Sequence, residues 1–120
     1  MIATLATTLA LLAGPTAAPP PATPVGMSAR EFSFGVYRPR VPTGRVRFNI
    51  HNFGEDPHDL QVRGPGGYRS SVSPEIEPGQ TVSFRVRLRR PGRYLLICLQ
   101  PGHAAAGMKA HLTVRKRAKR

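Results

Sequence analysis

Several residue types that other protein classes depend on are scarce in this chain. Its 120 residues hold one cysteine, no tryptophan, and six Asp and Glu against eighteen Lys and Arg. A single cysteine excludes an internal disulfide framework, so in an exported protein this thiol needs another explanation. The length suits one domain with tails. Signs of helix are also few, because glycines and prolines separate short apolar runs, a pattern typical of a sandwich or barrel of short strands.

The N-terminal segment lacks charged residues altogether. Residues 1–18 are apolar and rich in threonine, and three prolines follow at 19–21. The apolar run is too short to span a bilayer comfortably and is typical of a secretion signal, with small residues at 16–18 as the cleavage site. We therefore expect a secreted or periplasmic protein with a Pro/Ala-rich leader over 19–28. Because no Lys or Arg precedes the run, a true start upstream of Met1 stays open.

Alternating apolar residues beyond the leader predict β-strands. Every second side chain is apolar over 45–52 and again over 81–89, where arginines occupy the other parity. Residues 93–98 are apolar on both parities, which indicates a central strand covered on both faces. A further strand is expected to begin near His58. Phe32, Phe34 and Val36 are expected to share one face of a strand. The side chains expected to point inward are Val46, Phe48, Ile50, His58, Leu60, Val62, Val82, Phe84, Val86, Leu88, Met108, Ala110, Leu112 and Val114.

Two of the four histidines fall on the outward parity of their strands. His51 belongs to the polar set of 45–52, and His111 alternates with the apolar residues of 108–114. We expect both to lie on the solvent face and to bind no metal.

The remaining two histidines accompany the cysteine in a pattern that suggests a metal site. Cys98, His103 and Met108 follow one another at Cys-x4-His-x4-Met spacing, with Pro101-Gly102 and Gly107 between them. Proline and glycine allow a tight loop on which separated side chains converge. With His58 from the inward face of another strand, the set is two imidazoles, one thiolate and one thioether, which fits a trigonal copper site with a long axial bond.

This pattern resembles the cupredoxins, the plastocyanin and azurin family of small copper proteins. The resemblance covers residues 30–115 and all four ligand positions. It implies an all-β, antiparallel Greek-key β-sandwich of about seven strands over 29–115, followed by a basic tail at 116–120. It also implies one type 1 copper ion, with His58, Cys98 and His103 in the trigonal plane and Met108 as the weak axial ligand. The implied function is electron transfer rather than enzymatic turnover.

The resemblance also directs attention to residues around the ligands. Family members commonly carry asparagine directly after the first histidine ligand, where this chain has Asp59. We expect its carboxylate to accept a backbone N–H near Leu99 and, as a negative charge, to lower the reduction potential. Asn52 is either a second loop clamp or a turn residue before Gly54. Electrons are expected to pass through the edge of His103, among the small residues Pro101, Gly102, Ala104, Ala105 and Ala106.

A formal net charge of +12 raises the question of partners. A basic tail suggests nucleic acid, but no aromatic stacking platform or recognised nucleic-acid motif accompanies it, so no specific nucleic acid is expected. We expect the protein to be a monomer. We also expect it to bind redox partner proteins, acidic ones among them, and its positive charge to allow weak contact with an anionic membrane surface. The alternative function is copper storage or delivery without a redox partner. A dinuclear copper domain would need two cysteines.

Overall fold

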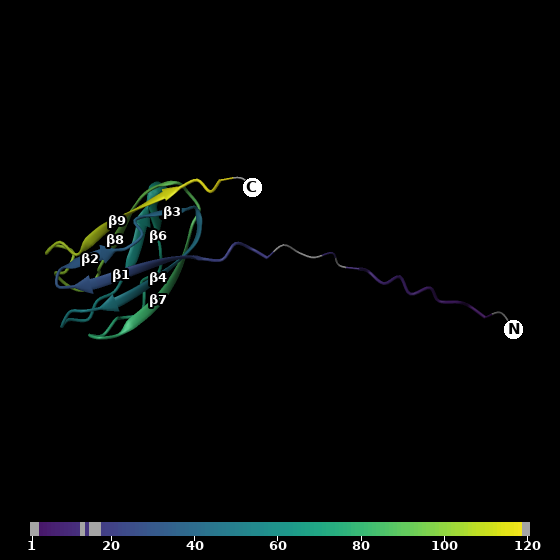
Figure 1. The fold of residues 1–120 in the computed structure, drawn as a ribbon, viewed down its shortest axis with the longest axis horizontal. Helices are drawn as coiled ribbons and strands as arrows, with labels where there is room; N and C mark the ends of the chain where they lie inside the picture. The colour runs from purple at the N-terminus through teal and green to yellow at the C-terminus, as the bar shows by residue number, and fades with distance from the viewer. Residues whose placement is uncertain (1–2, 13, 15–17, 119–120) are drawn as a thin grey trace.

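The computed structural model describes residues 3–12, 14 and 18–118. From Thr23 onward they form two β-sheets packed face to face (Figure 1). One sheet has the order β2-β1-β4-β7, and the other has the order β3-β9-β8-β5-β6. The strands of the first sheet are β1 (Thr23–Arg30), β2 (Ser33–Val36), β4 (Gly44–Asn52) and β7 (Thr81–Leu88). Those of the second are β3 (Arg40–Pro42), β5 (Gln61–Gly64), β6 (Tyr68–Arg69), β8 (Gly92–Ile97) and β9 (Lys109–Arg115), and a 3-10 turn, η1 (Pro65–Gly67), joins β5 to β6.

The core lies between the sheets and follows the parity expected from the sequence. Phe48 of β4 is fully buried and pairs in register with Phe84 of β7, while Leu96 of β8 and Leu112 of β9 close the core from the other sheet. One residue departs from the expected parity. Phe32 lies in the turn between β1 and β2 with 41% of its surface exposed. The alternation ends there because the strand does not begin until Ser33.

The all-β sandwich is confirmed, but its strand pairing is not purely antiparallel. Strand β1 runs parallel to β4, and β3 runs parallel to β9. The structure assigns nine strands within the described residues, against about seven expected. The extra strands are short or rich in proline and glycine, so they give little signal of their own. Within the same described residues there is no α-helix.

Strand β1 also changes the predicted start of the domain. Thr23, Val25 and Met27 are buried in the sandwich although they fall within the segment assigned to the leader. The expected boundary at residue 29 is therefore too late. Proline and glycine between these residues hide a strand that long-range pairing with β4 stabilises, over the register Thr23–Val46 to Ala29–Asn52.

The two ends of the chain leave the sandwich on the same side (Figure 1). The described residues before Thr23 form neither helix nor strand, and no helix among the described residues is long and apolar enough to cross a membrane. Most of the expected cleavage region at 16–18 and the last two residues of the tail lie outside the described residues. Within the tail, Arg117 donates its backbone N–H to the Thr43 hydroxyl at 3.1 Å.

Candidate metal centre

Three of the four predicted ligands lie on the loop between β8 and β9. Cys98 directly follows β8 and donates its backbone N–H to the Met108 carbonyl at 3.2 Å, which closes the base of the loop. Met108 donates its own N–H to the His103 carbonyl at 3.0 Å. Gly102 and Gly107 adopt φ of 80° and 111°, a region where side chains with a Cβ are strained. The loop therefore folds back on itself, as its proline and glycine content predicts.

The fourth predicted ligand, His58, comes from a different part of the chain. Its backbone N–H donates to the Ile76 carbonyl at 3.1 Å, and Ile76 donates back to the His58 carbonyl at 2.7 Å. This isolated bridge precedes β5, so the expected strand start near His58 is realised only at Gln61. The His58 side chain is fully buried, which confirms its inward direction.

The side chains of His58, Cys98 and His103 converge. The Nδ1 atoms of His58 and His103 are 3.2 Å apart, and Cys98 Sγ lies 3.7 Å from His103 Nδ1. One nitrogen or sulfur atom from each of the three residues lies within 4.8 Å of those of the other two, and all three residues are buried. Two imidazole nitrogens and a thiolate form a donor set that suits copper. The residues present therefore fit the ion that the sequence pattern implies.

Met108 is fully buried in the same core cluster as Cys98. Its backbone contacts to Cys98 and His103 hold it at the end of the ligand loop. A thioether in this place is compatible with a weak axial bond. The role of Met108 as a ligand stays a prediction.

Carboxylates hold the far sides of both imidazole rings. Glu31 Oε1 lies 3.1 Å from His58 Nε2, and Asp56 Oδ2 lies 3.5 Å from His103 Nε2. The same Glu31 oxygen accepts the backbone N–H groups of Glu55 at 2.9 Å and Asp56 at 2.6 Å. The Glu31 hydrogen bond fixes the orientation of the His58 ring, so that its Nδ1 faces the other candidate ligands, whereas Asp56 makes only a longer electrostatic contact to His103. Sequence reasoning missed Glu31 and Asp56, because nothing in their spacing connects them to the histidines.

Asp59 ties the His58 segment to the ligand loop. Its Oδ1 accepts the Leu99 backbone N–H at 2.7 Å, and its Oδ2 accepts the Gln100 side-chain amide at 2.9 Å. The first contact is the one expected from the sequence.

Asn52 fulfils both roles considered for it. Its Oδ1 accepts the Gly54 N–H at 2.8 Å, as a turn residue does, and its Nδ2 donates to the Asp56 carbonyl at 2.7 Å and the Ile76 carbonyl at 2.8 Å. The two contacts of Nδ2 link the loop before His58 to Ile76, whose backbone pairs with that of His58.

Burial and local hydrogen bonds set the protonation of the metal-free site. Burial lowers the pKa of His58 below the ordinary imidazole value, and burial raises the pKa of the Cys98 thiol. The Asp56 backbone N–H and neighbouring N–H groups lower the pKa of the Glu31 carboxyl. His58 is thus poised as a neutral ligand, whereas Cys98 must lose its proton when a metal binds, so acid competes with metal binding.

His103 is the most exposed of the four candidate ligands. Its residue surface is 8% exposed, and the Phe32 ring packs edge-on against it with centroids 5.0 Å apart. Pro101, Ala105 and Ala106 beside it are exposed. The small residues expected around His103 therefore border solvent, and the exposed Phe32 adds an aromatic side chain that the sequence did not point to.

The two histidines predicted to bind no metal lie away from the ligand cluster. His111 is exposed on β9, and His51 is half-buried with its Nδ1 2.7 Å from the Thr81 hydroxyl. Within the part of the chain that the structure describes, the metal-ligating group includes neither residue.

Comparisons with known proteins support the architecture. No family model matches the chain, and no curated protein sequence matches it. Among solved structures, reduced auracyanin from Roseiflexus castenholzii has a TM-score of 0.67 at 20% identity, covering 78% of this chain and 98% of its own. Auracyanin A, a "blue" copper protein from Chloroflexus aurantiacus, has a TM-score of 0.66 at 19% identity, with 79% and 100% covered. Reduced rusticyanin has a TM-score of 0.56 at 20% identity, with 80% and 82% covered. The chain therefore has the cupredoxin fold.

Proposed function

We propose that this protein binds one copper ion through His58, Cys98, His103 and Met108 and carries single electrons outside the cytoplasm. The observation that carries the proposal is the convergence of two Nδ1 atoms and one Sγ atom within 4.8 Å, all buried at one end of the sandwich. Copper bound there would supply a one-electron couple between its cuprous and cupric states.

The protein's own part is to hold the ligands still. The Cys98 thiolate, the two neutral imidazoles of His58 and His103, and the Met108 thioether would hold the ion. Glu31 orients the His58 ring, Asp56 lies beside the His103 ring, and the Asp59 contact fixes the start of the ligand loop. A coordination sphere that hardly moves between oxidation states is what an electron carrier needs, and these contacts supply that rigidity.

We place the route for electrons at the exposed edge of the ligand loop, beside His103. The small neighbours Pro101, Ala105 and Ala106 leave room for a redox partner to approach closely. The partner is a redox protein that docks briefly on these residues and Phe32. No catalytic turnover of a substrate is assigned to the site.

The N-terminal residues 1–18 are proposed to direct export and to be removed. Sequencing the N-terminus of the protein recovered from the exported fraction tests this, and an intact Met1 there would contradict it.

The decisive experiment for the metal site is titration of the purified protein with cupric ion, followed by absorption spectroscopy. We expect an intense visible thiolate-to-copper band at one equivalent, and its loss in Cys98→Ser, because serine keeps the size but removes the sulfur. His111→Gln is the matched control, since it removes an exposed imidazole and should keep the band. A band that survives Cys98→Ser would overturn the assignment.

Electron exchange separates a carrier from a copper storage protein. A carrier should exchange electrons rapidly with a small redox reagent and return to the same spectrum after repeated cycles. Release of copper on reduction would instead support storage or delivery.

A further inference from the structure

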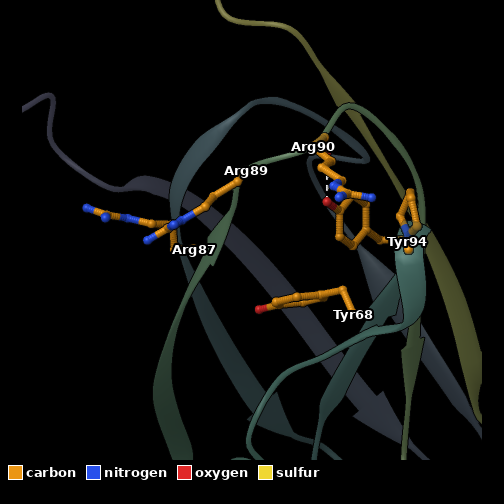
Figure 2. A pocket seen from close by; sticks show the side chains of 7 residues that line it. Tyr68, Arg87, Arg89, Arg90 and Tyr94 are labelled. Carbon is orange, nitrogen blue, oxygen red and sulfur yellow. Dashed lines mark hydrogen bonds between the residues drawn. The ribbon is translucent and has the colours of Figure 1, made fainter.

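A second concave site lies at the opposite end of β8 from the ligand loop. A cavity of about 390 Å³ opens between η1, the end of β7 and the start of β8, and it is lined by Tyr68, Arg87, Arg89, Arg90 and Tyr94. In the close view, Arg87 and Arg89 stand on one side with their side chains extending away from the tyrosines, Arg90 and Tyr94 stand on the other side, and the Tyr68 ring lies below the space between them (Figure 2). The volume falls within the range of small-molecule sites.

The positive charge of this cavity has no carboxylate to balance it. The two ion pairs found among the described residues both belong to histidines of the metal centre. The sequence has no Asp or Glu after Glu77 and none between Asp59 and Glu75, so the segments that build the cavity carry none. Among the residues that the structure describes, no carboxylate pairs with the three arginines of this cavity.

Neighbouring arginines add to this charge instead of relieving it. On the outer face of the first sheet, Arg45 lies opposite Arg87, and Arg47 lies opposite Arg85. Like charges directly opposite each other in an antiparallel pair are destabilising. An anion bound beside Arg87 would reduce that repulsion, so binding should also stabilise the fold.

The aromatic wall of the cavity is held in a defined position. Tyr94 is buried, its hydroxyl donates to the Arg90 carbonyl at 2.7 Å, and its ring meets the Tyr68 ring edge-on with centroids 5.9 Å apart. Glycine at position 64 lets the Tyr94 ring pack directly on the backbone, where a Cβ would collide with it. The buried Tyr94 thus holds the half-buried Tyr68 ring in place, and Tyr68 presents the apolar surface beside the arginines.

We propose that this cavity binds a small organic anion that carries a planar ring. The guanidinium group of Arg90, with those of Arg87 and Arg89 at the rim, can pair with a carboxylate or phosphate group, and the Tyr68 ring, held by Tyr94, offers a surface for the planar ring. The site is separate from the ligand loop and does not depend on copper.

Calorimetric titration of the full chain at low salt tests the proposal with three probes: phenyl phosphate, inorganic phosphate and phenol. We expect phenyl phosphate to bind most tightly, because it alone combines the charge with the ring. It should also raise the melting temperature. The Tyr68→Leu variant should bind phenyl phosphate less tightly than the parent protein does. Its affinity for inorganic phosphate should be unchanged.

The charge is tested with matched arginine variants. Arg89→Gln and Arg90→Gln should each lower the affinity for phenyl phosphate about tenfold, as expected for the loss of one charge-assisted hydrogen bond. Arg40→Gln removes the same charge from exposed β3, outside the cavity, and should leave the affinity within about twofold, as expected for a screened distant charge.

If Arg40→Gln lowered the affinity for phenyl phosphate as much as the cavity variants do, general attraction of anions to a basic protein would explain the binding. That result would overturn the proposal. Phenyl phosphate binding no tighter than inorganic phosphate would overturn the role of the ring, and no binding would overturn the site. The copper absorption band, recorded on the same samples, reports separately on the metal centre.

Discussion

Asp59 accepts the backbone N–H of Leu99 at 2.7 Å, across a separation of 40 residues in the chain. The contact joins the segment of one imidazole ligand to the loop that carries the other ligands. Asp59 is 8% exposed, whereas Leu99 is 38% exposed, so the bond is partly buried. A negatively charged residue therefore supports the candidate metal centre.

Replacing Asp59 with asparagine should keep the fold and raise the reduction potential. Asparagine retains an oxygen acceptor for Leu99 but removes the negative charge near the site, and that charge favours the oxidised ion. Voltammetry of the copper-loaded protein measures the shift. Asp59→Ala should lower the free energy of unfolding by about 0.5–1.5 kcal/mol, because it removes the partner of a partly buried N–H. An unchanged potential in Asp59→Asn would show that the charge does not act on the metal.

Met108→Leu should still bind copper and should have a higher reduction potential than the parent protein. Leucine fills a similar volume in the core but offers no weak axial ligand. Voltammetry and copper stoichiometry on both proteins check this. Complete loss of cupric binding would show that Met108 does more than tune the potential.

The double variant His51→Ala, His111→Ala should keep the copper stoichiometry and the visible spectrum. Both side chains lie outside the metal-ligating group of the described residues. Substitutions away from buried contacts change stability by about 0.5 kcal/mol or less per site, although His51 also loses its contact to Thr81. Loss of metal would contradict the register of both strands, since each places its histidine on the outer parity.

The metal-free protein should lose stability in mild acid. Burial lowers the pKa of His58 in the folded state, so the unfolded chain takes up a proton first, near the ordinary value of 6.5. The free energy of unfolding is then greatest above that value and falls as the pH drops through it. Glu31, whose pKa is also lowered, adds a further loss below its ordinary value of 4.5.

Denaturant titrations of the metal-free protein between about pH 7.5 and pH 5.5 measure this slope around the imidazole range. His58→Gln should reduce the slope of the free energy of unfolding against pH. His51→Gln is the control, because it removes a histidine outside the cluster, and it should leave that slope unchanged. A steep slope in His58→Gln would assign the effect to another group.

The candidate ligands and the inward faces could be predicted because they depend on short-range pattern, and three of the four candidates, His58, Cys98 and His103, lie together in the structure. A strand alternates with a period of two, so Val46, Phe48 and Ile50 reveal their burial without any partner strand. The ligand loop likewise carries Cys98, His103 and Met108 in one continuous segment. The expected Asp59–Leu99 contact rested on the family resemblance and was confirmed.

Other features were decided by contacts between distant segments. β1 is a strand because β4 pairs with it, and its own proline and glycine hide it. Glu31 reaches His58 only after the turn that follows β1 is packed against the loop before His58. The Arg/Tyr cavity combines η1 with β7 and β8 and left no pattern in the sequence.

The sequence alone determined the β class, the outward histidines and the candidate ligands, because residue type and alternation act locally along the chain. The tertiary structure decided the parallel pairing of β1 and β3, the carboxylates behind both imidazoles, and the place where unpaired arginines meet two tyrosines. The physical reason is that pairing and packing energies arise between segments far apart in the chain, and no local period encodes them.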